Sequence, residues 1–289
     1  MMTDNLRGSL FMVLAMLGFA IEDMLLKRVA AAGMPVGQVL ILFGGGGCLA
    51  FAALTRMQGQ RIWHPAVVQP RMLLKAGFEV MGRLFYTLAI AFTPLSSASA
   101  ILQATPLVVV AGAALIFGER VGWRRWSAIL IGLAGVLVIL RPGLEGFSAL
   151  SLLAVAGLIG FAGRDLATRA APRVLSNFQL GIYGFLAMVP TGAALLMWQG
   201  GAVRPDGMMA LQLGLAVAVG VFAYWALTVA MRTGEVSVVT PFRYTRLVFA
   251  LILGALVFAE RPDAATLIGS AIVVAAGVYT LLRSRKVNG

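Results

Sequence analysis

Long apolar segments separated by short polar connections run along this 289-residue chain. A helix needs about 20 predominantly apolar residues to cross the roughly 30 Å hydrocarbon core of a membrane. Ten segments meet that requirement and predict ten transmembrane helices, at about residues 8–27, 36–55, 74–92, 96–117, 123–140, 148–168, 177–198, 210–230, 236–258 and 264–282. The connections between them are too short for a separate soluble domain.

Composition agrees with a membrane protein. Hydrophobic residues make up 60% of the chain and charged residues 12%, whereas soluble domains carry roughly 25% charged residues. One histidine and one cysteine cannot assemble a zinc cluster, and the sequence contains no phosphate-binding glycine loop or nucleophile motif. We therefore expect that the protein is not an enzyme and that it binds no cofactor. The net charge of +12 comes from basic residues spread over many short loops, which argues against a nucleic-acid partner.

The basic residues also predict the orientation of the chain, because cytoplasmic loops of membrane proteins collect lysine and arginine. With the amino terminus inside, the inner segments hold 14 basic residues and the outer segments hold 5. Both termini of this multi-pass protein are therefore predicted to face the cytoplasm.

A pattern repeats at half the length of the chain. Phe-Gly-Glu-Arg at 117–120 returns as Phe-Ala-Glu-Arg at 258–261, a shift of 141 residues. Gly-Phe-Ala at 18–20 returns as Gly-Phe-Ala at 160–162, a shift of 142 residues. A half-length period of this kind indicates two related units.

The two units are residues 1–144 and residues 145–289, and each contains five predicted spans. Because five is odd, the second unit must enter the membrane from the side opposite to the first. The expected fold is an all-α integral membrane protein of ten transmembrane helices, arranged as two inverted five-helix repeats. Many secondary transporters have this architecture and bind substrate near the membrane midplane, between the repeats.

Several motifs resemble the EamA repeat of the drug/metabolite transporter superfamily. They are Pro-Leu-Ser-Ser-Ala-Ser-Ala at 94–100 with Gly-Glu-Arg at 118–120, and Pro-Phe-Arg-Tyr-Thr-Arg at 241–246 with Glu-Arg-Pro-Asp at 260–263. The resemblance covers almost the whole chain. It implies an inner-membrane carrier with one EamA repeat in each half, working by alternating access on a small organic metabolite. Similar proteins often carry an arginine in the second span, where this chain has Phe-Gly-Gly-Gly-Gly at 43–47.

Two of these features have structural interpretations. The glycines at 44–47 allow close packing of helices in lipid, or alternatively a hinge or a cavity lining. The Glu-Arg pairs at 119–120 and 260–261 stand at predicted span ends, where they favour a capping and loop-bridging role over a gate between the halves.

Ionisable residues within spans are candidate functional residues, because their burial in a membrane is costly. Glu22 and Asp23 lie in the first span, and Asp165, the repeat equivalent of Asp23, lies in the sixth. Asp23 precedes Lys27 by four residues and Asp165 precedes Arg169 by four, so each aspartate can form an intrahelical ion pair. We favour that structural role for the aspartates and keep Glu22 and Asp23 as candidates for ion coupling.

The third span contains Glu79 and Arg83, again four residues apart, and Tyr86. An intrahelical pair is the favoured interpretation. A glutamate in a low-dielectric interior can also take up a proton. Glu79 is therefore a second candidate for ion coupling and, with Arg83 and Tyr86, for substrate contact.

The ninth span contains the strongest candidates. Pro241 interrupts the helix, and Arg243, Tyr244 and Arg246 follow it without an acid four residues away on the same helix. Each arginine needs a counter-charge from another helix or from the substrate, and a guanidinium binds carboxylate or phosphate in a bidentate way. A direct substrate role and permanent neutralisation by Glu79, Glu22 or Asp165 both stay open.

The function favoured at this point is secondary active transport of a small organic metabolite with an anionic or zwitterionic group, either amino-acid-like or aromatic and vitamin-like. The alternatives are a lipid-headgroup flippase, a non-transporting scaffold whose internal charges are all paired, and a channel or sensor. The expected partners are the metabolite and membrane lipid. The direction of transport and the oligomeric state, a homodimer or a monomer, stay open.

Overall fold

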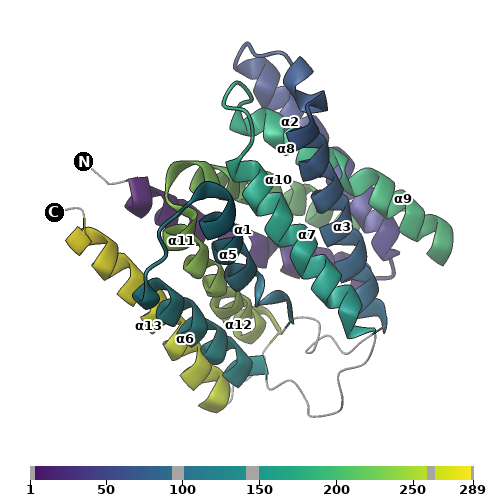
Figure 1. Cartoon of the computed structure of the whole chain (residues 1–289). Coiled ribbons are helices and arrows are strands. Elements are labelled where there is room, and N and C mark those ends of the chain that lie inside the picture. The colour runs from purple at the N-terminus through teal and green to yellow at the C-terminus, as the bar shows by residue number, and fades with distance from the viewer. Residues whose placement is uncertain (1–3, 93–100, 141–149, 259–263, 288–289) are drawn as a thin grey trace.

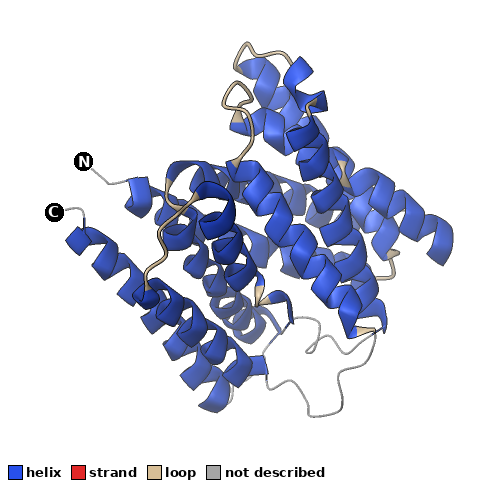
Figure 2. Cartoon of the chain, in the orientation of Figure 1, coloured by secondary structure: helices blue, strands red, loops and turns tan. Residues whose placement is uncertain are grey.

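The chain is helical apart from short connections over residues 4–92, 101–140, 150–258 and 264–287, the ranges that this computed structural model describes (Figures 1 and 2). The first half contains α1 (Asp4–Ala31), α2 (Val36–Met57), the 3₁₀ turn η1 (Pro65–Val68), α3 (Pro70–Phe92), α5 (Thr105–Phe117) and α6 (Trp123–Leu140). The second half contains α7 (Ser151–Arg169), α8 (Asn177–Leu186), α9 (Met188–Gln199), α10 (Gly207–Thr233), α11 (Val236–Val239), the 3₁₀ turn η2 (Thr240–Tyr244), α12 (Thr245–Phe258) and α13 (Ala264–Val287).

Where they are described, the predicted spans fall on these helices, with the seventh divided into α8 and α9 and the ninth into α11, η2 and α12. The fourth span begins outside the described residues, and α5 covers its part from Thr105. The motifs at 94–100 and 260–263 lie outside the described residues. Within the described residues, four segments are long and apolar enough to cross a membrane, judged by length and composition: α1, α2, α8 with α9, and α10.

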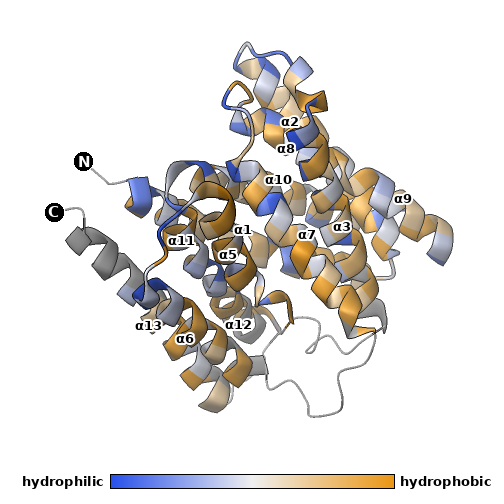
Figure 3. Cartoon of the chain, in the orientation of Figure 1, coloured by the Kyte–Doolittle hydropathy of each residue, from blue (hydrophilic) through white to orange (hydrophobic). Residues whose placement is uncertain are grey.

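Hydrophobic residues, coloured orange on the ribbon of Figure 3, make up much of the helices, and many of their large side chains are exposed. Leu49 of α2, Leu115 of α5 and Leu256 of α12 are 73%, 87% and 78% exposed. Such a surface is expected where lipid tails surround the helices, because lipid is as apolar as leucine itself.

Helices of the first half pack against helices of the second half. α1 packs mainly against α10, α3 against α7, α2 against α8 and α9, and α6 against α13. Small residues permit the close approach. A Cβ added to Gly18 of α1 would lie 2.8 Å from the Cβ of Ala223 in α10, and a Cβ added to Gly160 of α7 would overlap the backbone of Gly82 in α3.

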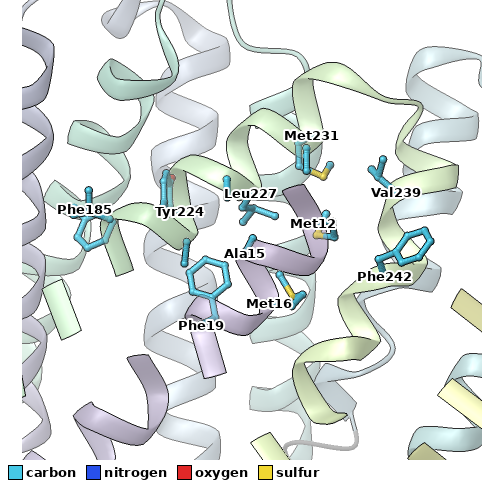
Figure 4. Close-up of a cluster of buried hydrophobic side chains, with 14 of the residues drawn as sticks. Met12, Ala15, Met16, Phe19, Phe185, Tyr224, Leu227, Met231, Val239 and Phe242 are labelled. Atoms are coloured by element: carbon cyan, nitrogen blue, oxygen red, sulfur yellow. The ribbon is translucent and has the colours of Figure 1, made fainter. Parts of the chain in front are cut away.

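The largest apolar core lies where α1 meets α10 and η2 (Figure 4). Its labelled side chains include Met12, Met16 and Phe19 of α1, Tyr224, Leu227 and Met231 of α10, and Phe242 of η2. This core holds together the helices that carry the charged residues described below.

The glycines of the second span serve close packing. α2 continues as one helix through all four of them. A Cβ added to Gly47 would overlap the ring of Phe185 in α8, and a Cβ added to Gly44 would lie 2.9 Å from the Cβ of Met188 in α9. Gly45 alone among the four has no neighbouring atom within 4 Å of such a Cβ. The packing interpretation therefore accounts for most of this run, and the helix has no break at it.

The broken ninth span is held at its start by the first half of the chain. Glu119, which follows α5, accepts hydrogen bonds from the backbone N–H groups of Val236 and Ser237, each at 3.0 Å. Arg125 of α6 forms an ion pair with Glu235 at 2.7 Å and donates to Ser237 Oγ at 2.8 Å. Glu119 thus contacts the opposite half of the chain and fixes the start of α11.

Candidate functional site

Ionisable side chains from both halves gather inside the bundle, around Glu79 of α3. Glu79 and Lys75, one turn earlier on the same helix, are each 2% exposed, and Lys75 Nζ lies 3.1 Å from Glu79 Oε2. The Tyr224 hydroxyl of α10 accepts a hydrogen bond from Lys75 Nζ at 2.9 Å and donates one to Glu79 Oε2 at 3.0 Å. These three groups form a closed hydrogen-bonded triangle, which compensates the burial of both charges.

Arg164 of α7 connects this triangle to a second carboxylate. Its Nη1 lies 3.4 Å from Glu79 Oε1, and its Nε donates to Asp165 Oδ1 at 2.9 Å. The guanidinium also lies over the ring of Phe161, 5.1 Å from the centroid, in a cation–π contact. Arg164 therefore bridges acidic groups on two helices.

Arg243 of η2 is paired with the same aspartate. Its Nη1 contacts Asp165 Oδ2, so that one carboxylate is shared between Arg243 and Arg164. The side chain of Asp165 is 1% exposed and that of Arg243 is 13% exposed. This contact joins the broken ninth span to α7.

Arg246, at the start of α12, is paired with Asp23 of α1. Its Nε and Nη2 both donate to Asp23 Oδ2, the former at 3.0 Å, and its guanidinium lies 5.2 Å from the ring centroid of Phe19. Arg246 is 36% exposed and Asp23 is 52% exposed. Asp23 lies on the order of 12 Å from the end of its helix, at 1.5 Å per residue. The pair is far more exposed than Lys75, Glu79 and Asp165, whose side chains are at most 2% exposed.

Equivalent positions of the two halves thus meet at one centre. Asp23 and Asp165, which hold the two arginines of the ninth span, are 142 positions apart in the sequence. Phe19 and Phe161, whose rings lie against arginines of this cluster, have the same separation. The first helix of each half therefore contributes an aspartate and an aromatic ring.

Three further predicted residues border the cluster. Glu22 is 2% exposed, its Oε2 has no hydrogen-bond partner within the described part of the chain, and the positive charges of Arg83 and Arg246 act on it. The Arg83 guanidinium lies 5.9 Å from the ring centroid of Phe161. Tyr86 meets that ring edge-on, with 6.0 Å between centroids.

Tyr244 is placed elsewhere. Its hydroxyl donates to the backbone carbonyl of Ile129 in α6 at 3.3 Å, and its ring packs where a Cβ on Gly132 would lie. Consecutive residues of a 3₁₀ helix point about 120° apart, since three residues make one turn. Arg243 can therefore face Asp165 while Tyr244 faces α6.

The ion pairs of Asp165 and Glu79 include partners that the sequence did not predict, on the same helix and on other helices. Asp165 is paired with Arg164 and Arg243, and Arg169 donates instead to the backbone carbonyl of Met231 at 3.3 Å. Glu79 is paired with Lys75 on the preceding turn of its own helix and with Arg164 of α7. The side chain of Lys27, the predicted partner of Asp23, lies outside the described residues. Spacing along one helix could not reveal the partners that lie on other helices, Arg164 for Glu79 and Arg243 for Asp165.

Sequence reasoning missed Arg164, Lys75 and the polar role of Tyr224. Arg164 stands within the sixth span, so the high cost of an intramembrane charge was the signal that could have found it. Lys75 stands at the start of the predicted third span, where a lysine is typical of an inner loop. Tyr224 stands near the end of the predicted eighth span, where an aromatic residue is typically an interfacial anchor.

This arrangement suits the binding of small charged groups by exchange of ion pairs. Guanidinium groups bind carboxylate or phosphate through two parallel hydrogen bonds. Among the described residues, no group of three or more His, Cys, Asp or Glu side chains is placed to hold a metal ion.

Comparison with known proteins adds independent findings. The model of the EamA-like transporter family matches residues 6–141 and 148–282. The chain is 31% identical to the pseudopaline exporter of Pseudomonas aeruginosa, over 99% of this chain and 100% of that protein. It is 28% identical to a riboflavin transporter of Vibrio cholerae, over 93% and 91%, and 25% identical to an S-adenosylmethionine uptake transporter of Rickettsia prowazekii, over 71% and 69%. One solved crystal structure, at 22% identity and with a TM-score of 0.82, covers 98% of this chain and 99% of its own and shows a shared fold.

Proposed function

The chain belongs to the EamA-like transporter family of the drug/metabolite transporter superfamily, and on that premise we propose that it moves a small organic metabolite with an anionic or zwitterionic group across the bacterial inner membrane. Its named relatives are transporters and exporters, and it is not an enzyme. We propose secondary active transport by alternating access.

The observation that carries this proposal is the cluster of charged side chains drawn from both halves. Among the side chains that the structure describes, it combines four carboxylates with five cations: Glu22, Asp23, Glu79 and Asp165 with Lys75, Arg83, Arg164, Arg243 and Arg246. A positive excess in a low-dielectric interior favours a ligand that brings negative charge. The guanidinium group of each arginine in the ninth span can bind a carboxylate or a phosphate through two hydrogen bonds.

Reciprocal packing supports an inverted relation between the halves. The pairing of α1 with α10 is matched by that of α7 with α3, as a two-fold relation requires. Gly18 meets Ala223 in the first pair, and Gly160 meets Gly82 in the second. Gly82 and Ala223 are 141 positions apart. The excess of basic residues in the predicted inner loops supports placing both termini in the cytoplasm.

Glu22 is the residue that we propose for ion coupling. Glu79 already has Lys75, Arg164 and Tyr224 as partners, and Asp23 is bound by Arg246. Glu22 instead has an oxygen without a partner among the described residues. A proton on this carboxyl would change the charge beside Arg246 without breaking an existing ion pair.

Counterflow in proteoliposomes tests the proposal. Purified protein should accelerate the saturable exchange of at least one member of a panel of amino acids, nucleoside-like compounds and vitamins. Arg243→Lys keeps the positive charge opposite Asp165 but loses the planar guanidinium group and its bidentate hydrogen bonding. It should reduce that exchange at least tenfold while the protein stays folded. Arg204→Ala, at an exposed loop position, is the matched control and should transport normally.

Each alternative gives a different result in the same assay. A scaffold with permanently paired charges would exchange none of the panel, and a channel would not saturate. A flippase would move labelled lipid between leaflets. Wild-type exchange rates in both Arg243→Lys and Arg246→Ala would place the binding site elsewhere.

A further inference from the structure

Two connections pack together at one end of the bundle. The connection from α2 to α3 contains η1, and the connection from α7 to α8 lies against it (Figure 1). We call residues 56–74 and 170–176 together the η1 surface. Buried side chains from these connections and from the start of α8 form one small apolar cluster: Ala66, Val67, Met72, Ala171, Leu175 and Leu180.

Hydrogen bonds from α8 hold the longer connection in place. Gln179 Nε2 donates to the backbone carbonyl of Arg61 at 2.8 Å, and the Tyr183 hydroxyl donates to the carbonyl of Ile62 at 2.9 Å. The same glutamine completes the capping box of α8 with Ser176. The η1 surface is therefore a folded part of the molecule, and its side chains project from a fixed backbone.

The η1 surface is basic. Its two segments contain no aspartate or glutamate. Its exposed arginines are Arg56, Arg61, Arg71 and Arg173. Within the described part of the chain, none of the four is paired with a carboxylate. Arg125 of α6, by contrast, is paired with Glu235 at 2.7 Å. The positive charges of the η1 surface are thus available to a negatively charged partner.

Large apolar side chains are exposed on the same segments. Trp63, Val68 and Val174 are 60%, 53% and 61% exposed. Leu73 and Leu74, at the start of α3, are 58% and 57% exposed, so the apolar surface continues onto a predicted transmembrane helix. Tryptophan is enriched at the membrane–water interface, where its ring lies at the level of the lipid headgroups.

We propose that the η1 surface binds anionic phospholipids. The guanidinium groups of Arg61, Arg71 and Arg173 bind the phosphate of the headgroup, as guanidinium groups bind phosphate elsewhere. Trp63 and Val68 lie against the adjoining apolar part of the lipid. A phospholipid matches both the charge and the apolar side chains, whereas a small soluble anion would engage the arginines alone.

Thermal unfolding of the detergent-purified protein tests this site, because a ligand that binds the folded state raises its stability. Phosphatidylglycerol, which carries a net negative charge, is compared with phosphatidylcholine of the same acyl chains, which carries none, and with inorganic phosphate. We expect a saturable rise of the unfolding midpoint with phosphatidylglycerol only. Added salt should reduce that rise, because it screens exposed charges.

Variants locate the site on the protein. A basic residue near an anionic membrane surface contributes about fivefold to affinity. Arg71→Gln should therefore weaken phosphatidylglycerol binding about fivefold, and Arg61→Gln/Arg71→Gln/Arg173→Gln should weaken it at least tenfold. Their midpoints in phosphatidylcholine should match the wild type, since these side chains are exposed. Arg204→Gln, in the exposed connection from α9 to α10, is the matched control for Arg71→Gln and should bind like the wild type. Trp63→Ala should also weaken binding.

Three results would overturn the proposal. Equal midpoint shifts with phosphatidylglycerol and phosphatidylcholine would exclude a role for headgroup charge. A wild-type response of the triple arginine variant would place the lipid elsewhere, and an equal rise with inorganic phosphate would show that a free anion is sufficient. The lipid site is independent of the transported metabolite, so a failure to detect counterflow would leave these expectations unchanged.

Discussion

Removing the charge of Glu79 is expected to destabilise the bundle more than any comparable change on its surface. Glu79 lies 3.1 Å from Lys75 Nζ and 3.4 Å from Arg164 Nη1, with both carboxylate oxygens in use. Glu79→Gln keeps the size of the side chain and an acceptor for Tyr224. It leaves the buried Lys75 without a counter-charge.

The expected loss follows from these distances. Two unit charges 3.1 Å apart attract each other by about 5 kcal/mol at an effective dielectric constant of 20. Breaking a buried ion pair by removing one partner costs about 3 to 5 kcal/mol in measured cases. Arg164 keeps Asp165 as a partner, so it adds little to that loss. We expect Glu79→Gln to lower the free energy of unfolding by about 3 to 5 kcal/mol.

Two control variants make the measurement specific. Glu235→Gln makes the same chemical change in the ion pair with Arg125, where the glutamate is 47% exposed, and should cost less than about 1 kcal/mol. The double variant Lys75→Met/Glu79→Gln removes both charges, so it should recover most of the stability lost in Glu79→Gln.

Thermal unfolding of detergent-purified protein, followed by size-exclusion chromatography with fluorescence detection, gives the comparison. At about 2 °C per kcal/mol, the midpoint of Glu79→Gln should fall by about 6 to 10 °C. Equal midpoints for Glu79→Gln and Glu235→Gln would refute the idea that the buried charge holds the bundle together. A double variant less stable than Glu79→Gln would refute the role assigned to Lys75.

Two further predictions concern helix packing and ion coupling. Gly47→Ala should lower stability by about 1 to 3 kcal/mol through overpacking against Phe185, whereas Gly45→Ala, with open space around it, should not; equal thermal midpoints for the two variants would contradict the packing of α2. Glu22→Gln should retain counterflow but lose substrate accumulation driven by a pH gradient, and accumulation at the wild-type level in that variant would exclude Glu22 as the coupling residue.

Much of the helical framework could be predicted from the apolar segments and from helix-breaking residues between and within them. The ninth span illustrates this, since Pro241 predicts the interruption that appears as η2. The repeat also placed Asp23 and Asp165 at equivalent positions. Their partners, Arg246 and Arg243, follow those aspartates by 223 and 78 residues, so helical spacing could not identify them.

The candidate site was predicted only in part, because its members include partners that lie far apart in the sequence. An intramembrane charge is conspicuous in a sequence, and this marked Glu79, Arg243 and Arg246. Lys75 stands near the start of α3, where sequence position alone could not separate a loop lysine from a buried one. Its burial depends on Tyr224, 149 residues away.

The sequence by itself therefore determined where the helices run and which of them carry charge, because a chain in lipid must satisfy its backbone hydrogen bonds within each helix. Only the tertiary structure decided how those charges are paired, because each partner depends on which helices of the two halves face one another. It also decided that the pair of Arg246 and Asp23 stays accessible while that of Lys75 and Glu79 does not. Accessibility is a property of the packed bundle, and the spacing of residues along one helix does not contain it.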